Sequence, residues 1–276
     1  MSSNFYKKFE SRRDKLKSLL CVGIDPEWEK LPHDCQKKEF PLFEFAKAIV
    51  SSTHPYAVAW KPNVAFFERF GAKGFSEFER YVAYCKEVDV SIPIIADAKR
   101  GDLANTAKEY AKYYFETLKV DALTINAYMG KDTILPYLEL GGFVFILCLT
   151  SNPSSIDLQK LTLKTKDVFL YEEVSDFASR LEEEYPGQVG IVMGGTHPSE
   201  LSGIRKRHPN LLFLIPGFGA QGGSLAEIYT ACGKNGIINS SRGVTLLSRD
   251  SDYTKLAIKK ATEINEELAK LLRNPV

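Results

Sequence analysis

The chain has 276 residues, of which 44% are hydrophobic, and its 36 basic and 35 acidic side chains give a net charge of +1. This length and apolar content suffice for one large core, whereas the even charge balance argues against a surface built for nucleic acid or for an anionic membrane. No apolar stretch reaches the ~20 residues of a membrane helix, and the polar N-terminus is unlike a signal peptide. We therefore expect no nucleic acid and no membrane among its partners.

The cysteines and histidines indicate neither a disulfide framework nor a metal centre. The five cysteines are odd in number and form no C-x-x-C pair. The four histidines lack the spacing of metal ligands. We expect a reduced, cytoplasmic protein with no bound metal.

Short apolar runs recur along the chain, each separated from the next by an amphipathic segment of helix length. A helix over about residues 2–18 precedes them, and the eight runs cover Leu20–Asp25, Ala57–Lys61, Ile92–Asp97, Ala122–Asn126, Phe143–Thr150, Val189–Gly194, Leu211–Pro216 and Gly236–Ser240. Because the runs are almost continuously apolar, they are typical of parallel strands buried on both faces. Their alternation with helices predicts a single-domain (β/α)8 TIM barrel over residues 1–276, with a doubly wound open sheet as the alternative.

The segments between the runs include clear helical patterns. Helices are expected over Leu103–Leu118, Ser224–Cys232 and Asp250–Leu272. The longest connection, about residues 151–188, carries its own helical pattern over Leu170–Glu184. We interpret this connection as an elaborated loop of the barrel rather than as a second domain.

The third run ends in the densest group of charges, because Asp97, Lys99, Arg100 and Asp102 lie within six residues. Strand side chains alternate between faces, so Asp97 and Lys99 should project into the same interior space where the strand stops. Barrels place their chemistry at this end of their strands, and buried charges are rare unless they are paired or reactive. The pair therefore predicts a functional site, with an exposed charged turn as the alternative.

Two further charged residues stand at the ends of earlier runs. Lys61 ends the second run and Asp25 the first. Alone, Lys61 would fit a surface lysine, and Asp25 a helix cap or a turn. Together with Asp97 and Lys99, they form an alternating set of charges that can neutralise one another in a closed barrel mouth.

Two neighbouring features late in the chain indicate an anion site. The seventh run leads into Pro216–Gly223, whose glycines let backbone amides approach a phosphate in front of a helix. Its G-x-G-x-x-G spacing also fits a dinucleotide fingerprint, but it follows the seventh strand and no acid ends the next one. Arg242, after the eighth run, adds a guanidinium suited to phosphate. A tight turn without a ligand and an exposed arginine are the alternatives.

The charges of the third run form a D-x-K-x-x-D motif, which alone marks only a wide suprafamily of phosphate-binding barrels. The motif and the other elements that accompany it follow in chain order as Gly23–Pro26, Lys61, Asp97, Lys99, Asp102, Thr106, Thr150–Pro153, Pro216–Gly223 and Arg242. This full set, which covers almost the whole chain, resembles the orotidine 5'-phosphate decarboxylase family, closest to its longer bacterial (type 2) branch. Leu103 and Ala104 depart from the family's usual residues, which puts only the packing near the substrate in doubt.

The resemblance implies decarboxylation of orotidine 5'-monophosphate to uridine 5'-monophosphate and carbon dioxide, the last step of de novo UMP synthesis, without metal or organic cofactor. Lys99 would stabilise a carbanion at C6 of the pyrimidine and then protonate it, with Asp97 beside the departing carboxylate. Lys61 would hold Asp97 and a ribose hydroxyl, and Asp25 would also bind the ribose.

The resemblance also implies a homodimer, in which Asp102 and Thr106 reach across the interface into the neighbouring site. Ser151 would read the edge of the pyrimidine. The remaining substrate-binding positions, most of them around the phosphate, would be Pro216, Gln221, Gly222, Ser241 and Arg242.

Two other functions remain open. A magnesium-dependent sugar-phosphate decarboxylase or aldolase of the same suprafamily shares the motif but holds its metal with an acid at the second strand end, where this chain has Lys61. A catalytically inactive protein that binds nucleotide phosphates would need the phosphate loops, but it would not need Asp97, Lys99 and Asp102.

Overall fold

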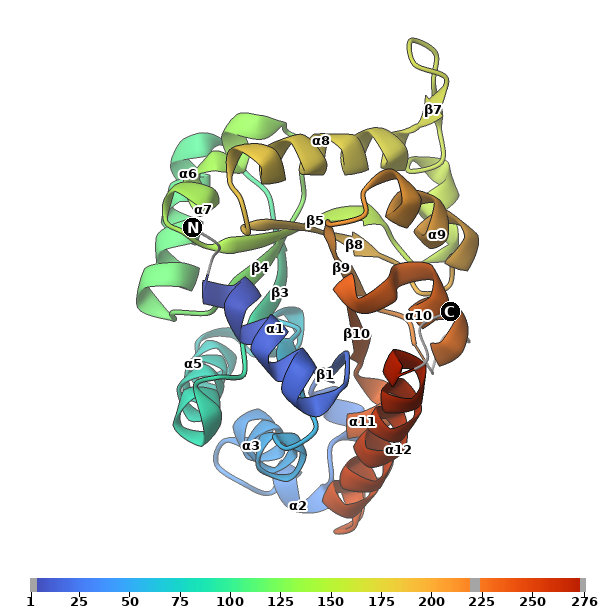
Figure 1. The fold of residues 1–276 in the computed structure, drawn as a ribbon. Coiled ribbons are helices and arrows are strands. Elements are labelled where there is room, and N and C mark those ends of the chain that lie inside the picture. The colour runs from blue at the N-terminus through green and yellow to red at the C-terminus, as the bar shows by residue number, and fades with distance from the viewer. Residues whose placement is uncertain (1–3, 219–223, 274–276) are drawn as a thin grey trace.

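The computed structural model describes residues 4–218 and 224–273. Eight parallel strands form one sheet in the order β2-β1-β10-β9-β8-β5-β4-β3 (Figure 1). Their bounds are β1 Leu20–Ile24, β2 Ala59–Pro62, β3 Ile95–Arg100, β4 Ala122–Ile125, β5 Phe143–Leu149, β8 Val189–Met193, β9 Leu212–Ile215 and β10 Gly236–Ser240. Parallel bridges between Trp60 and Ile94 and between Asn63 and Asp97 join the outer strands β2 and β3. The sheet is therefore closed, which confirms the predicted barrel and excludes the open sheet.

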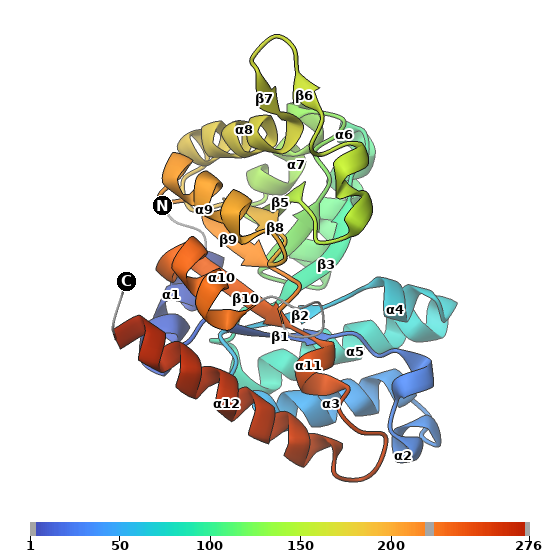
Figure 2. The ribbon, with the colours of Figure 1, turned by 90° about the vertical axis from the view of Figure 1, so that its right-hand side faces the viewer.

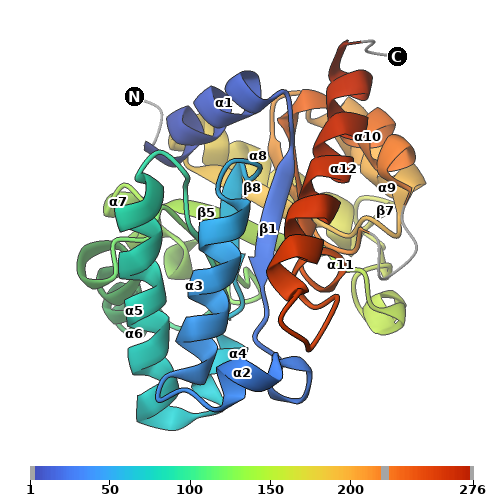
Figure 3. The same cartoon turned by 90° about the horizontal axis from the view of Figure 1, so that it is seen from below.

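Helices surround this barrel (Figures 1 and 3). The longer ones are α1 Asn4–Leu16, α3 Pro41–Thr53, α5 Gly71–Asp89, α6 Ala104–Ala111, α8 Leu170–Glu184, α9 Pro198–Arg207, α10 Leu225–Cys232 and α12 Tyr253–Arg273. Short turns of helix are η1 Trp28–Lys30, α2 His33–Gln36, α4 Ala65–Glu68, η2 Lys112–Thr117, η3 Lys131–Thr133, α7 Leu135–Glu139, η4 Pro153–Asp157, η5 Gly233–Asn235 and α11 Arg242–Thr245. Figure 3 shows α3 and α12 on either side of β1, so this strand is covered from outside.

The N-terminal helix α1 closes the end of the barrel at which the strands begin. Phe5 and Phe9 are buried, and the Phe5 ring lies 4.6 Å from that of Phe143 at the start of β5. Lys8 forms a 2.7 Å ion pair with Asp121, the residue before β4. The helix thereby seals the bottom of the core and leaves the C-terminal ends of the strands for a site.

Two details differ from the expected elements. The helix predicted over Leu103–Leu118 ends as α6 at Ala111 and continues as a π-helical segment, in which Leu118 N–H donates to Tyr113 five residues earlier. This wider turn buries Tyr114 in a crowded aromatic stretch. The long connection after β5 contains the predicted helix α8 and, unexpectedly, a small hairpin of β6 Thr162–Leu163 and β7 Val168–Phe169, which projects from the barrel (Figure 2).

Six of the eight barrel strands are buried along their whole length. Burial on both faces explains why their sequences read as continuous apolar runs rather than as alternating ones. Within the described residues, no helix combines the length and the apolarity needed to cross a bilayer.

Candidate active site

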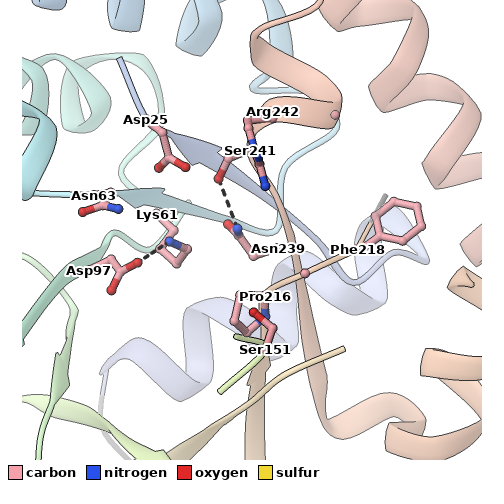
Figure 4. A pocket seen from close by; sticks show the side chains of 12 residues that line it. Asp25, Lys61, Asn63, Asp97, Ser151, Pro216, Phe218, Asn239, Ser241 and Arg242 are labelled. Atoms are coloured by element: carbon pink, nitrogen blue, oxygen red, sulfur yellow. Dashed lines mark hydrogen bonds and ion pairs between the residues drawn. The ribbon is translucent and has the colours of Figure 1, made fainter. Parts of the chain in front are cut away.

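Side chains from the ends of six strands meet at the open end of the barrel (Figure 4). Asp25 follows β1, Lys61 lies in β2 and Asp97 lies in β3. Residues after β5, β9 and β10 complete the lining of the same cavity with Ser151, Pro216, Ser241 and Arg242. The structure thus brings together these seven residues that the sequence predicted for one site.

Asp97 lies between two lysines. Lys61 Nζ is 2.6 Å from Asp97 Oδ2, and Lys99 Nζ is 2.6 Å from Asp97 Oδ1. The side chain of Lys61 is 5% exposed and that of Asp97 11%, whereas Lys99 is 49% exposed. Lys61 is therefore fixed in the wall, while Lys99 presents its ammonium group to the open cavity.

These neighbours set the charge of each buried group. Burial alone would raise the pKa of the Asp97 carboxyl, but the positive charges of Lys61 and Lys99 outweigh it and hold that pKa well below its usual value. Burial alone would lower the pKa of Lys61, but the carboxylates of Asp97 and Asp25 raise it above its usual value. Both groups therefore stay ionised at neutral pH.

Asp25 and its surroundings present unused acceptors to the cavity. Oδ1 of Asp25 and Oδ1 of Asn239 are buried and find no hydrogen-bond partner among the described residues. Burial raises the pKa of Asp25, and Lys61 and Ser241 oppose that rise. Asn239 Nδ2 donates to Ser241 Oγ at 3.2 Å (Figure 4). Buried acceptors without donors are costly in a folded protein, so this corner is built for a ligand that brings hydroxyl groups.

Gly23 makes room for this corner. A Cβ at this position would lie 1.9 Å from Ser241 Oγ and 2.9 Å from Asn239 Oδ1. A side chain on β1 would therefore push both polar groups away from Asp25. The close approach of β1 and β10 at the mouth depends on glycine here.

Two adjoining cavities share Lys61, Asp97, Ser151 and Pro216. The first holds about 160 Å³ and is lined by the polar residues near Asp25 and Arg242. The second holds about 410 Å³, and three apolar side chains contribute to its wall together with Lys99, namely Leu147, Val192 and Leu214. A ligand with a polar, anionic part and a flat, less polar ring would fill both.

The segment that carries Ser151 is held from two sides. Gln159 accepts a hydrogen bond from Thr150 N–H at 2.8 Å and donates to Thr150 Oγ1 at 2.8 Å. His197, in the loop after β8, lies with Nε2 3.1 Å from the Thr150 carbonyl oxygen. These contacts fix the backbone beside Ser151.

Asp102 and Thr106 lie outside both cavities of their own chain. Asp102 Oδ1 accepts a hydrogen bond from Leu103 N–H at 2.8 Å. Thr106 is exposed and borders a separate hollow of about 250 Å³ on the outside of the barrel. Aromatic and charged side chains form the rest of that hollow: Phe75, Arg100, Glu109, Tyr110, Tyr113 and Tyr114.

The predicted phosphate loop is described only in part. Pro216 lines both cavities, and Gly217 adopts the left-handed conformation with φ of 102°. Gln221 and Gly222 lie outside the described residues.

Sequence reasoning missed three polar residues that line the two cavities, which are Asn63, Thr124 and Asn239. Asn63 carried a usable signal, because it follows Lys61 by two residues at the same strand end. Thr124 and Asn239 lie inside strands, where a single polar residue in the sequence does not indicate a site. Within the described part of the chain, no three acidic, cysteine or histidine side chains are grouped to hold a metal ion.

Comparisons with known proteins agree on one family. The family model described as "Orotidine 5'-phosphate decarboxylase / HUMPS family" matches residues 18–251. The orotidine 5'-phosphate decarboxylase of Leptospira interrogans is 48% identical over 264 residues, which cover 95% of either chain.

Solved structures give the same result. The OMP decarboxylase of Leishmania donovani superposes with a TM-score of 0.83 at 37% identity, over 99% of this chain and 100% of that one. The UMP synthase of the same organism superposes with a TM-score of 0.84 at 39% identity, over 99% of this chain but 57% of that longer one.

The charge state of Asp97 makes the stability of the fold depend on pH. Asp97→Asn should lower the free energy of unfolding by about 3 kcal/mol at neutral pH, because buried Lys61 loses its ion pair and keeps only the weaker interaction with Asp25. The folded pKa lies below the unfolded one of about 3.9, so this contribution is complete above about pH 4 and is lost as the pH falls further.

Urea unfolding of both proteins between about pH 3 and pH 7 measures this difference. The difference in free energy of unfolding between wild type and Asp97→Asn should shrink at the acid end. The control Asp250→Asn, at an exposed carboxylate, should differ from wild type by almost nothing at any pH. A difference that stays constant with pH would contradict the lowered pKa of Asp97 in the folded protein.

Proposed function

The chain belongs to the orotidine 5'-phosphate decarboxylase family, and we propose that it converts orotidine 5'-monophosphate to uridine 5'-monophosphate and carbon dioxide, the last step of de novo UMP synthesis. The observation that carries this proposal is the row of Lys61, Asp97 and Lys99 across the barrel mouth, with 2.6 Å between each lysine and the carboxylate. A metal-free reaction that develops negative charge on carbon needs such a fixed cation.

Lys99 is the residue that we assign to the reacting carbon. When the C6 carboxylate leaves as carbon dioxide, the electron pair of the broken bond stays on C6 in the plane of the ring, where the π system cannot take it up. The half-exposed ammonium group of Lys99 can stabilise this charge and then give C6 its proton. Solvent reprotonates the lysine for the next turnover.

Asp97 has two roles in the proposal. Its depressed pKa keeps it ionised, so it holds the Lys99 ammonium group in place before the reaction. It also lies beside the position of the substrate carboxylate, and the repulsion between the two carboxylates is relieved as carbon dioxide forms. The first role follows from the contacts of Asp97, and we rank it above the second.

The polar cavity suits the ribose and the phosphate. Asp25 keeps a buried oxygen free to accept a hydrogen bond from a ribose hydroxyl, and Lys61 lies between Asp25 and Asp97. Ser241 and Arg242 line the same cavity and suit the phosphate, which Gln221 and Gly222 would also contact. Phosphate binding can hold the substrate while the ring reacts at a distance.

The second cavity suits the pyrimidine. Its apolar wall can pack on the ring, and Ser151, at the boundary of the two cavities, can bond to the polar edge of the base. Pro216 lies at the same boundary. The fixed backbone around Thr150 supports this role of Ser151.

We further propose a homodimer in which Asp102 and Thr106 complete the partner's site. Neither residue lines a cavity of its own active site, and exposed Thr106 borders an outer hollow lined by aromatic rings. A carboxylate brought from a second copy would add a counter-charge to Lys99.

Two statements complete the proposal. The magnesium-dependent alternative lacks its acidic ligand, because Lys61 stands at that position and forms an ion pair with Asp97. We expect the enzyme to act in the cytoplasm, because its substrate and product are charged nucleotides and its five cysteines are free and buried.

Incubation with orotidine 5'-monophosphate in the presence of a chelator tests the activity. Ultraviolet absorbance should follow the conversion to uridine 5'-monophosphate, at the same rate with and without chelator. Absence of turnover would overturn the proposal, and turnover that the chelator abolishes would support the magnesium-dependent alternative.

Two substitutions should separate chemistry from binding. Lys99→Ala should lower kcat by more than about 1000-fold while uridine 5'-monophosphate still binds, since the loss falls on the transition state. Arg242→Ala should mainly raise KM, by about 10- to 150-fold, since a charge-assisted contact to phosphate is lost. Lys259→Ala, at an exposed lysine of α12, is the control. Near-normal turnover of Lys99→Ala would remove Lys99 from its assigned role.

Mixed dimers test the shared site. Lys99→Ala and Asp102→Ala should each be nearly inactive alone, but dimers formed from both chains contain one site with an intact Lys99 and an intact Asp102. A random mixture should recover about a quarter of the wild-type activity, because half of the dimers are mixed and each has one competent site of two. If Asp102 served its own chain, mixing would restore nothing.

A further inference from the structure

Thr124 contacts both halves of the charged pair in β3. It lies in β4, is 1% exposed, and borders the larger cavity. Its hydroxyl donates to Asp97 Oδ1 at 3.0 Å and accepts a hydrogen bond from Lys99 N–H at 3.0 Å. One side chain on the neighbouring strand therefore holds a carboxylate and the backbone of a lysine at once.

The backbone of β3 explains why this hydroxyl is needed. Ala96 pairs with Leu123 and Arg100 pairs with Ile125, so four steps along β3 match two steps along β4. Thr124 stands opposite the extra residues, where the regular ladder of hydrogen bonds is interrupted. Its hydroxyl supplies the partner that the Lys99 N–H lacks in the ladder.

Lys99 is strained within this bulge. Its φ is +49°, a left-handed conformation that is unfavourable for a residue with a side chain. Such strain persists only where the surroundings hold it. The bond from Lys99 N–H to Thr124 is one contact that does so.

The hydroxyl also fixes the direction of Asp97. Because one lone pair of Thr124 Oγ1 is taken by Lys99 N–H, its proton points to Asp97 Oδ1. That oxygen is shared with Lys99 Nζ, while Lys61 Nζ binds Oδ2. Three donors from three strands therefore orient the carboxylate.

We propose that Thr124 is a positioning residue for the reaction, which sets the geometry of Asp97 and Lys99 without touching the reacting atoms. This inference rests on the proposed function for its kinetic effect. Loss of the hydroxyl removes the partner of Lys99 N–H and one of the three donors that orient the Asp97 carboxylate. The effect falls on the transition state, in which the Lys99 ammonium must lie close to C6.

Thr124→Val tests the proposal, because it keeps the shape and removes the hydroxyl. We expect kcat to fall by about 10- to 100-fold, while the Kd of uridine 5'-monophosphate changes by less than about threefold. Thr124→Ser restores the hydroxyl and should recover most of kcat. Thr53→Val removes an equally buried hydroxyl, which donates to Ile49 O in α3, and should leave kcat unchanged.

The thermal unfolding midpoints of all variants show whether a loss of kcat only reflects a loss of stability. Unchanged kcat in Thr124→Val, or a loss that Thr124→Ser shares, would overturn the proposal. If Thr124→Val does not fold, Thr124→Ala also removes the hydroxyl and can be compared with Thr124→Ser in its place.

Crystal structures separate this inference from the proposed function. In Thr124→Val the Asp97 carboxylate or the Lys99 backbone should move relative to wild type, and in Thr124→Ser neither should. If the wild type fails to turn over orotidine 5'-monophosphate, the proposed function fails, and the structures still decide whether Thr124 positions the pair. An unmoved Asp97 and Lys99 in Thr124→Val would overturn the inference.

Discussion

The buried ion pair between Lys61 and Asp97 is the interaction on which the rest of the structure depends. Lys61 lies on β2 and Asp97 on β3, the two strands that isolated bridges join in place of a continuous ladder. Removing Asp97 would leave buried Lys61 with only the weaker interaction of Asp25, and removing Lys61 would leave Asp97 with only the half-exposed Lys99; breaking a buried pair in this way costs several kcal/mol. The pair therefore spans the seam at which the barrel closes, and closing the barrel also assembles the site.

The closed end of the barrel contributes mainly to stability, and the open end carries the functional site. At the bottom, α1 buries Phe5 and Phe9 and pairs Lys8 with Asp121. At the top, Asp25 and Asn239 each keep a buried oxygen that no described residue donates to, and Lys99 keeps a left-handed backbone. Each of these features costs free energy in the absence of a ligand, and the packing of the closed end offsets that cost. The mouth can thus stay arranged for its substrate before the substrate binds.

The sequence allowed the barrel and its charged centre to be predicted, because both depend on short-range patterns. Continuous apolar runs identify strands buried on both faces, and the residues that end them were expected to meet. Thr124 could not be found in this way, since its role depends on the register between β3 and β4, which a single sequence does not contain. The hairpin of β6 and β7 is equally hidden, because strands of two residues leave no periodicity to detect.

The bulge in β3 also sets the course of the chain between Lys99 and Asp102. The left-handed turn at Lys99 returns Arg100 to β4, where its carbonyl accepts a hydrogen bond from Asn126 N–H at 2.7 Å. Beyond it, the side chain of Asp102 lines neither cavity of its own chain and accepts a hydrogen bond from Leu103 N–H. The described charged groups of the two adjoining cavities are three cations, Lys61, Lys99 and Arg242, and two carboxylates, Asp25 and Asp97. The excess of one positive charge favours an anionic phosphate beside Arg242, and a carboxylate from a second chain beside Lys99 would limit the attraction of that lysine for any other anion. Dimerisation would in this way adjust the charge of the site as well as its shape.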